Sequence, residues 1–157
     1  GKDYAQMIDA AEKQGTQIVS AAQNMTFTLG RARVTFIGPA RTQHTDSRDD
    51  GLTLRIDYGQ TSVVVTGCIT SNGEKEIVSS GAAAACDALI VSRGGTEAAT
   101  CAEWVEAAKP KVALITGKNP ANSVRIRLQK YGATVYAAKE NGVMTLFSDG
   151  QEITVEP

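Results

Sequence analysis

The stretch Ser62-Val63-Val64-Val65-Thr66-Gly67-Cys68 is an apolar run that stops at a small, glycine-containing turn. A second run, Asp87-Ala88-Leu89-Ile90-Val91-Ser92-Arg93-Gly94-Gly95-Thr96, has the same form and ends at two consecutive glycines. Short apolar runs that are rich in β-branched residues and bounded by glycine turns are typical of buried strands. We therefore expect both runs to be core strands, with functional residues at their ends.

Outside these runs, the apolar pattern predicts a mixed α/β fold. Strands and helices alternate after residue 60, which favours parallel strands joined by right-handed crossovers. Before residue 60, Gly30-Arg31 and Tyr58-Gly59-Gln60 each interrupt alternating residues, which predicts two antiparallel hairpins. The expected elements are a helix at 3–14, strands at 17–20, 25–29, 33–37, 52–56 and 63–65, a helix at 72–80, a strand at 89–91, a helix at 101–108, a strand at 112–115, a helix at 122–130 and a strand at 134–137.

Two further predictions concern the ends of helices. The alanine run at 82–85 is more typical of a short helical extension than of a linker. Thr100 precedes the helix at 101–108, so its hydroxyl is expected to cap that helix.

Composition excludes several classes of protein. The 157 residues fit one domain, residues 1–157, and carry 16 basic and 17 acidic side chains for a net charge of −1. A nearly neutral chain has no global field that would attract nucleic acid or anionic lipid. The apolar stretches are the length of strands, far below the roughly 20 residues that span a bilayer. We therefore expect no transmembrane segment in this chain, and any contact with DNA would need a local basic patch.

The three cysteines, Cys68, Cys86 and Cys101, are too few and too widely spaced for a disulfide scaffold. We expect all three to be small, buried and reduced, because free cysteines are commonly buried. The alternative is a disulfide between Cys86, which enters a strand, and Cys101, which opens the following helix.

The two strand ends resemble those of the metallo-β-lactamase superfamily, and most closely its ComEC-like branch, which is linked to DNA uptake. In that branch the first run ends in Thr-Gly-Asp and the second in His-His-Gly-Ser, and the Asp and His side chains bind metal. Here Cys68 takes the place of the Asp, and Arg93 and Gly94 take the place of the two His. The resemblance covers residues 4–155 and depends on six segments in the same order, namely Tyr58-Gly59, Thr66-Gly67, 87–96, 109–111, 130–133 and 141–150.

This resemblance implies the later half of a four-layer αββα sandwich whose metal site is lost. A complete domain has an earlier half with an HxHxDH-type motif, which this chain lacks, and the loop at 117–123 holds no His. Arg93 would also place a positive charge where a divalent cation sits. We therefore expect a non-catalytic, metal-free module without a cofactor, acting in binding or assembly and related to DNA uptake. The alternative is a metal-dependent hydrolase of the phosphodiesterase or nuclease type, with its ligands in a missing segment or a partner chain.

A second alternative is that the end of the second run binds an anion or a nucleotide. A guanidinium, two glycine amides and two hydroxyls are the groups that hold phosphate or carboxylate in proteins. The expected groove is lined by Cys68, Ser92, Arg93, Gly94, Gly95 and Thr96. The competing interpretation is that Arg93 forms a salt bridge or faces water.

His44 is the single histidine of the chain and lies in the polar loop at 42–51. We expect this loop to be solvated, and a weak surface metal site formed by His44 with neighbouring aspartates is the alternative. Arg125, Arg127 and Lys130 are expected to form a solvated helix face, because no aromatic residues accompany them to stack nucleic acid bases.

The missing half of the sandwich leads to a prediction about partners. One face of the sheet should be apolar and uncovered, with Leu52, Leu54, Val63, Val65, Leu89 and Val91 on it. We therefore expect a homodimer through this face, or docking onto an earlier half of the domain. If the chain is part of a ComEC-like protein, it lies on the extracytoplasmic face of the membrane.

Overall fold

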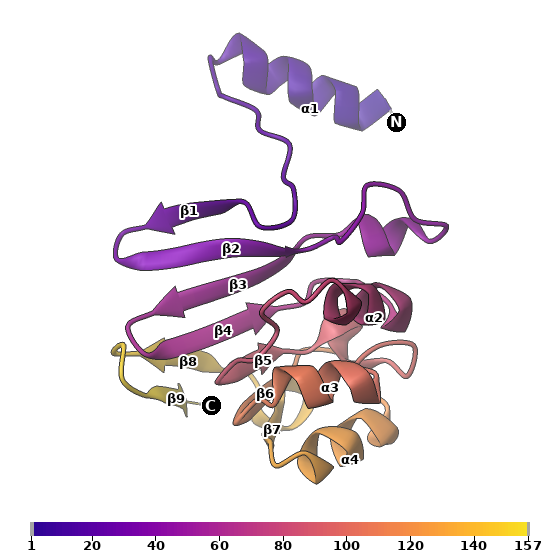
Figure 1. The fold of residues 1–157 in the computed structure, drawn as a ribbon, viewed down its shortest axis with the longest axis vertical. Helices are drawn as coiled ribbons and strands as arrows, with labels where there is room; N and C mark the ends of the chain where they lie inside the picture. Colours follow the sequence, from indigo (N-terminus) through magenta and orange to yellow (C-terminus); the bar gives the residue numbers. More distant parts are fainter. Residues whose placement is uncertain (1, 157) are drawn as a thin grey trace.

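Seven strands form one mixed sheet, and two further strands form a separate hairpin (Figure 1). The computed structural model describes residues 2–156. The strands are β1 (Thr26–Leu29), β2 (Ala32–Gly38), β3 (Thr53–Tyr58), β4 (Thr61–Val65), β5 (Ala88–Ile90), β6 (Val112–Ile115), β7 (Thr134–Ala137), β8 (Thr145–Ser148) and β9 (Ile153–Glu156). The helices are α1 (Lys2–Lys13), α2 (Ser71–Ser79), α3 (Ala102–Ala108), α4 (Asn122–Lys130) and α5 (Ala138–Asn141), with 3-10 turns η1 (Ser47–Asp50) and η2 (Ser92–Gly95).

The order of strands in the sheet confirms the predicted mixed α/β fold. The strands lie in chain order from β1 to β7, with antiparallel pairs up to β4 and parallel pairs from β4 to β7. Both predicted hairpins are present, as β1–β2 and β3–β4. α4 and β7 have the bounds that the sequence pattern predicted.

Helices α2, α3 and α4 cover one face of the sheet (Figure 1). The parallel register pairs Val64 with Leu89 and Leu89 with Ala113, so these three side chains share that face. All three are fully buried and pack in one cluster with Trp104 and the helices. Burial of one side chain of this size contributes roughly 1.5–3 kcal/mol, so this face holds the core.

The opposite face of the sheet is only half covered. Leu54 and Ile56 of β3 pair with Val65 and Val63 of β4, and all four side chains are half-buried. The β8–β9 hairpin lies against the start of β4, where the Ser148 and Thr61 hydroxyl oxygens are 2.6 Å apart. The apolar, partly open sheet face predicted from the sequence is therefore present along β3 and β4.

Two residues predicted for the open face lie on the other side. Leu89 and Val91 are 0% and 2% exposed and belong to the helix-covered core. The parallel register sets Leu89 beside Val64 rather than Val63, and Val91 follows two residues later on the same face. Leu52 precedes β3 and is 45% exposed.

Three local predictions were wrong. Residues 17–20 form no strand, and residues 82–85 are not helical, because Gly81 adopts a left-handed φ of 74° and ends α2. Thr100 does not cap α3: its own φ is 58°, and its hydroxyl is buried without a hydrogen-bond partner. Glu74 of α2 instead fixes the segment in front of α3, because its carboxyl group accepts the amides of Thr100 at 2.6 Å and Cys101 at 2.8 Å.

The N-terminal helix α1 stands apart from the sheet (Figure 1). It was predicted at 3–14, and Tyr4 and Met7 on its apolar side are 64% and 59% exposed. In the part of the chain that the structure describes, the helices are too short or too polar to cross a membrane.

Glu74 makes the stability of the fold depend on pH. The carboxyl is fully buried, and burial raises its pKa to about 7, although the Cys101 and Thr100 amides and the Arg127 charge act in the opposite direction. The native state therefore keeps a proton that the unfolded chain releases near pH 4.5. Because the native state binds more protons between these values, the unfolding free energy contributed by Glu74 falls as pH rises from about 4.5 to 7.

We predict that Glu74→Gln reduces the pH dependence of stability between pH 5 and 8. The full pKa difference corresponds to about 3 kcal/mol of pH-dependent unfolding free energy, which the variant cannot show. Urea unfolding at several pH values, followed by the fluorescence of Trp104, measures the unfolding free energy of each protein as a function of pH. Glu97→Gln, on an exposed site, is the control and should keep the wild-type slope. Equal slopes in all three proteins would contradict the prediction.

Candidate functional site

The parallel pairing of β4 and β5 brings the two predicted strand ends together. The Arg93 amide donates to the Gly67 carbonyl at 3.0 Å, and the Ser92 hydroxyl donates to the Ile69 carbonyl at 2.6 Å. The Thr66 hydroxyl donates to the Ile90 carbonyl at the same edge. The segments after β4 and after β5 therefore form one connected surface at the carboxyl edge of the sheet.

The turn after β5 has an unusual backbone. Arg93, Gly94 and Gly95 have φ values of 50°, 63° and 82°, all in the left-handed region. The Gly95 carbonyl accepts the Ala121 amide at 2.8 Å, and a Cβ added at Gly94 would lie 2.7 Å from the Cα of Gly117. The turn is thus fixed between the segment after β4 and the loop after β6, which positions Arg93.

The charge of Arg93 is not neutralised by a neighbouring carboxylate. Among residues 2–156 no acidic side chain forms a salt bridge with Arg93, and the side chain is half-buried. Its field reaches the loop before β3: the pKa of Asp46 is lowered to about 2, chiefly by hydrogen bonds from Arg48 and in small part by Arg93. Arg93 therefore presents a guanidinium that is available to an anion.

The other residues of the predicted groove differ in their availability. The Ser92 hydroxyl is already bonded to a backbone carbonyl, whereas the Thr96 hydroxyl is buried without a hydrogen-bond partner. Cys68 is exposed on the neighbouring turn, so the expectation that all three cysteines are buried was wrong for this residue.

The remaining cysteines are inert in this structure. Cys86 and Cys101 are free and buried, so the alternative of a disulfide between them is wrong. Burial raises the pKa of each thiol to about 12. Within residues 2–156, no three His, Cys, Asp or Glu side chains are grouped so that they could hold a metal ion.

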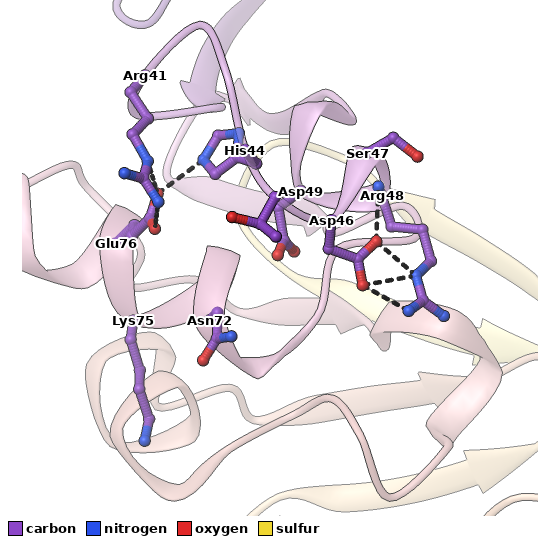
Figure 2. A pocket seen from close by; sticks show the side chains of 10 residues that line it. Arg41, His44, Asp46, Ser47, Arg48, Asp49, Asn72, Lys75 and Glu76 are labelled. Carbon is purple, nitrogen blue, oxygen red and sulfur yellow. Dashed lines mark hydrogen bonds and ion pairs between the residues drawn. The ribbon is translucent and has the colours of Figure 1, made fainter.

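A pocket of about 720 Å³ lies between the loop before β3 and helix α2 (Figure 2). Its walls are mostly charged or polar, and Figure 2 shows that they come from two elements that face each other. The lining residues are Arg41, His44, Thr45, Asp46, Ser47, Arg48, Asp49, Asn72, Lys75 and Glu76.

His44 connects the two walls of the pocket. Most of its loop is exposed, as predicted, but the side chain of His44 itself is only 3% exposed. The Nδ1 atom lies 2.8 Å from Asp50 Oδ1, and the Nε2 atom lies 2.7 Å from Glu76 Oε2 on α2. Arg41 holds the same Glu76 carboxylate through Nε at 3.0 Å. The spacing of these residues in the sequence gave no signal for this cluster, because Glu76 lies on a different element.

The two carboxylates favour the charged form of His44. The pKa of the imidazole is raised above 6.5, chiefly by the hydrogen bond with Asp50, and Glu76 adds to the effect. Burial and the charge of Arg41 act in the opposite direction.

The basic residues of α4 are partly committed to internal contacts. Arg125 pairs with Glu140 at 2.5 Å, and Arg127 donates to the Thr100 carbonyl at 2.5 Å. Arg127 therefore joins α4 to the start of α3, and the prediction of a wholly solvated basic face was wrong for it. Lys130 is exposed, as predicted.

We predict that Gly94→Ala destabilises the protein by about 1–3 kcal/mol. The added methyl group combines a left-handed φ with the close approach to Gly117. Gly81→Ala is the matched control, since its φ of 74° is similar and its added Cβ meets nothing within 4 Å. Thermal unfolding of both variants separates the contact from the backbone strain, and equal losses would show that the contact with Gly117 is unimportant.

Comparison with known proteins gives one distant relative. No protein-family model matches the chain. The chain is 24% identical over 144 residues to ComE operon protein 3 of Bacillus subtilis (strain 168). The aligned part covers 88% of this chain and 19% of that protein, so the chain spans about a fifth of the length of the relative it matches.

Proposed function

We propose that this chain is a non-catalytic binding or assembly module of the metallo-β-lactamase type, corresponding to the later half of such a domain and serving a protein related to DNA uptake. In this proposal the chain binds through its open sheet face, which a second β-sheet covers. In the isolated chain a second copy supplies that layer.

The difference between the two sheet faces carries this proposal. Val64 and Leu89, on the helix side, are fully buried, whereas Val63 and Val65, next to them in sequence, remain half-buried on the other side. Leu54 and Ile56 continue the same apolar surface onto β3. A sheet with one apolar face left partly in water is stabilised when a further layer covers that face.

The comparison supports the link to DNA uptake. The relative is a ComE operon protein by name, and the sequence of this chain resembles the ComEC-like branch at its strand ends. The match extends over most of this chain, which includes both strand ends, the turn at Arg93 and the open face.

The residues at the two strand ends do not fit a metal ion. Cys68 is a single thiol on an exposed turn, and Arg93 brings a guanidinium into the same edge. A catalytic zinc site needs about three protein ligands of imidazole, carboxylate or thiolate type. A metal-dependent hydrolase would therefore require ligands from another segment or chain, and the assembly function needs none.

We predict that the protein forms dimers in the micromolar range and that Ile56→Lys weakens them at least tenfold. A lysine ammonium covered by a second sheet loses its hydration, and a cost of about 1.4 kcal/mol already gives a tenfold change in the dissociation constant. Sedimentation equilibrium measures it, with circular dichroism to confirm that the variant is folded. Ile126→Lys, at a 56% exposed position on α4, is the matched control and should dimerise like wild type. A wild-type chain that stays monomeric, or a dimer that Ile56→Lys does not weaken, would contradict association through this face.

A second candidate function is anion binding at the turn after β5, which the unpaired guanidinium of Arg93 favours. The turn combines this charge with a buried Thr96 hydroxyl that has no hydrogen-bond partner. A phosphate or carboxylate oxygen would accept charge-assisted hydrogen bonds from the Arg93 guanidinium.

We predict that inorganic phosphate at about ten times its dissociation constant raises Tm by roughly 3–6 °C at constant ionic strength. Arg93→Ala should abolish this rise, because it removes the one charged donor of the turn. Arg125→Ala, which removes a guanidinium paired with Glu140, is the control and should keep it. A phosphate effect that is equal in all three proteins would assign it to nonspecific salt.

A further inference from the structure

The contacts of His44 favour the doubly protonated, charged form of its ring. Both ring nitrogens face carboxylate oxygens, at 2.8 Å for Nδ1 with Asp50 and 2.7 Å for Nε2 with Glu76. An ionised carboxylate can only accept a hydrogen bond, and a neutral imidazole carries a single N–H. The neutral ring would therefore leave one nitrogen lone pair against a carboxylate, whereas the imidazolium donates to both.

We propose that His44 is a pH-operated clamp, which holds residues 42–46 of the loop before β3 on α2 while the ring is doubly protonated and releases them when the ring loses a proton. The clamp joins the two walls of the charged pocket of Figure 2, so its release opens that pocket. This inference concerns a different surface from the open sheet face and does not depend on the proposed assembly function.

The charged groups around the ring come from both elements. From its own loop, Asp50 accepts one N–H, and Arg41 lies across the shared Glu76 carboxylate with its NH2 group 2.5 Å from Oε1. From α2, Glu76 accepts the other N–H, and Lys75 lines the same pocket but pairs with Glu103 at 3.2 Å. Asp46 and Arg48, further along the pocket wall, pair with each other.

A second anchor restricts which part of the loop moves. The buried carboxylate of Asp49 accepts the Thr70 amide at 2.6 Å and the Thr70 hydroxyl at 2.9 Å. These bonds hold η1 at the N-terminal end of α2 and do not involve the imidazole. Arg41 is likewise held on α2 by Glu76 without the imidazole. Loss of the His44 proton should therefore free residues 42–46, between these two anchors, and leave Arg41 and η1 in place.

The direction of the pH effect follows from the raised pKa of His44. The unfolded chain loses this proton near 6.5, and the clamped form keeps it to higher pH. The stabilisation that the clamp contributes is thus complete below pH 6.5 and disappears as pH rises through the pKa of the folded state. The loop segment is held at acidic pH and is released as pH rises through the pKa of the folded state, which lies above 6.5.

NMR tests the clamp directly, because His44 is the single histidine and its ring signals need no assignment between residues. We expect both ring nitrogens to carry protons at pH 6.5, with a titration midpoint above the ordinary value of a histidine. Amide signals of residues 42–46 should shift with the same midpoint, and their hydrogen-exchange protection, corrected for the intrinsic rate, should fall at least tenfold above it. The amides of η1 should keep their protection.

Variants separate the clamp from a histidine that is merely buried. Glu76→Gln and Asp50→Asn each remove one acceptor charge and should lower the midpoint, with early release of residues 42–46. Asp46→Asn makes the same chemical change in the same loop, but its carboxylate is bound to Arg48, so the midpoint should stay as in wild type. A midpoint near 6.5 in every protein, or loop amides that do not follow the ring, would overturn the proposal.

Discussion

Strand β4 pairs in parallel with β5, with Val63, Val64 and Val65 opposite Ala88, Leu89 and Ile90. This register decides which of these side chains face the core and which segments meet at the edge of the sheet. Because parallel strands end at the same edge, the segments after β4 and β5 are joined there by the bond from the Arg93 amide to Gly67. The same register alternates the valines of β4 between the helix-covered core and the open face. One pairing therefore sets both the candidate anion site and the candidate association surface.

Helix α2 supplies side chains both to the core beside this sheet and to the pocket. Glu74 points into the core and accepts the Thr100 amide in front of α3, whereas Glu76, two residues later, points outward to His44 and Arg41. Side chains two apart on a helix face in different directions, so one short helix supports the core packing on one side and the pocket wall on the other. Both carboxyl groups take part in contacts that proton binding modifies.

Local sequence patterns were sufficient for the fold and insufficient for the side-chain clusters. Periodicity and glycine turns predicted the two hairpins, α4 and β7 well, because these features depend on residues close in sequence. The assignment of Leu89 to the open face failed because the face of a short apolar strand depends on its register with a neighbour. The Thr100 cap failed because Thr100 has a left-handed backbone and Glu74 of α2 binds its amide, which no local pattern indicates. The contacts of His44 were missed for a related reason: its polar loop is mostly exposed, as predicted, but Glu76 on another element binds the ring.

The three cysteine thiols differ in their exposure to solvent, so one of them can be labelled selectively with a dye. Cys86 and Cys101 are buried, and Cys68 alone is exposed, on the turn that contacts Arg93 through Gly67. Trp104, the single tryptophan, is fully enclosed between the sheet and the helices. A thiol-reactive acceptor dye would thus attach at Cys68 and receive energy from one fixed indole donor. Energy transfer between Trp104 and the dye would then report movement of the turn after β4 relative to the core, without any substitution in the sequence.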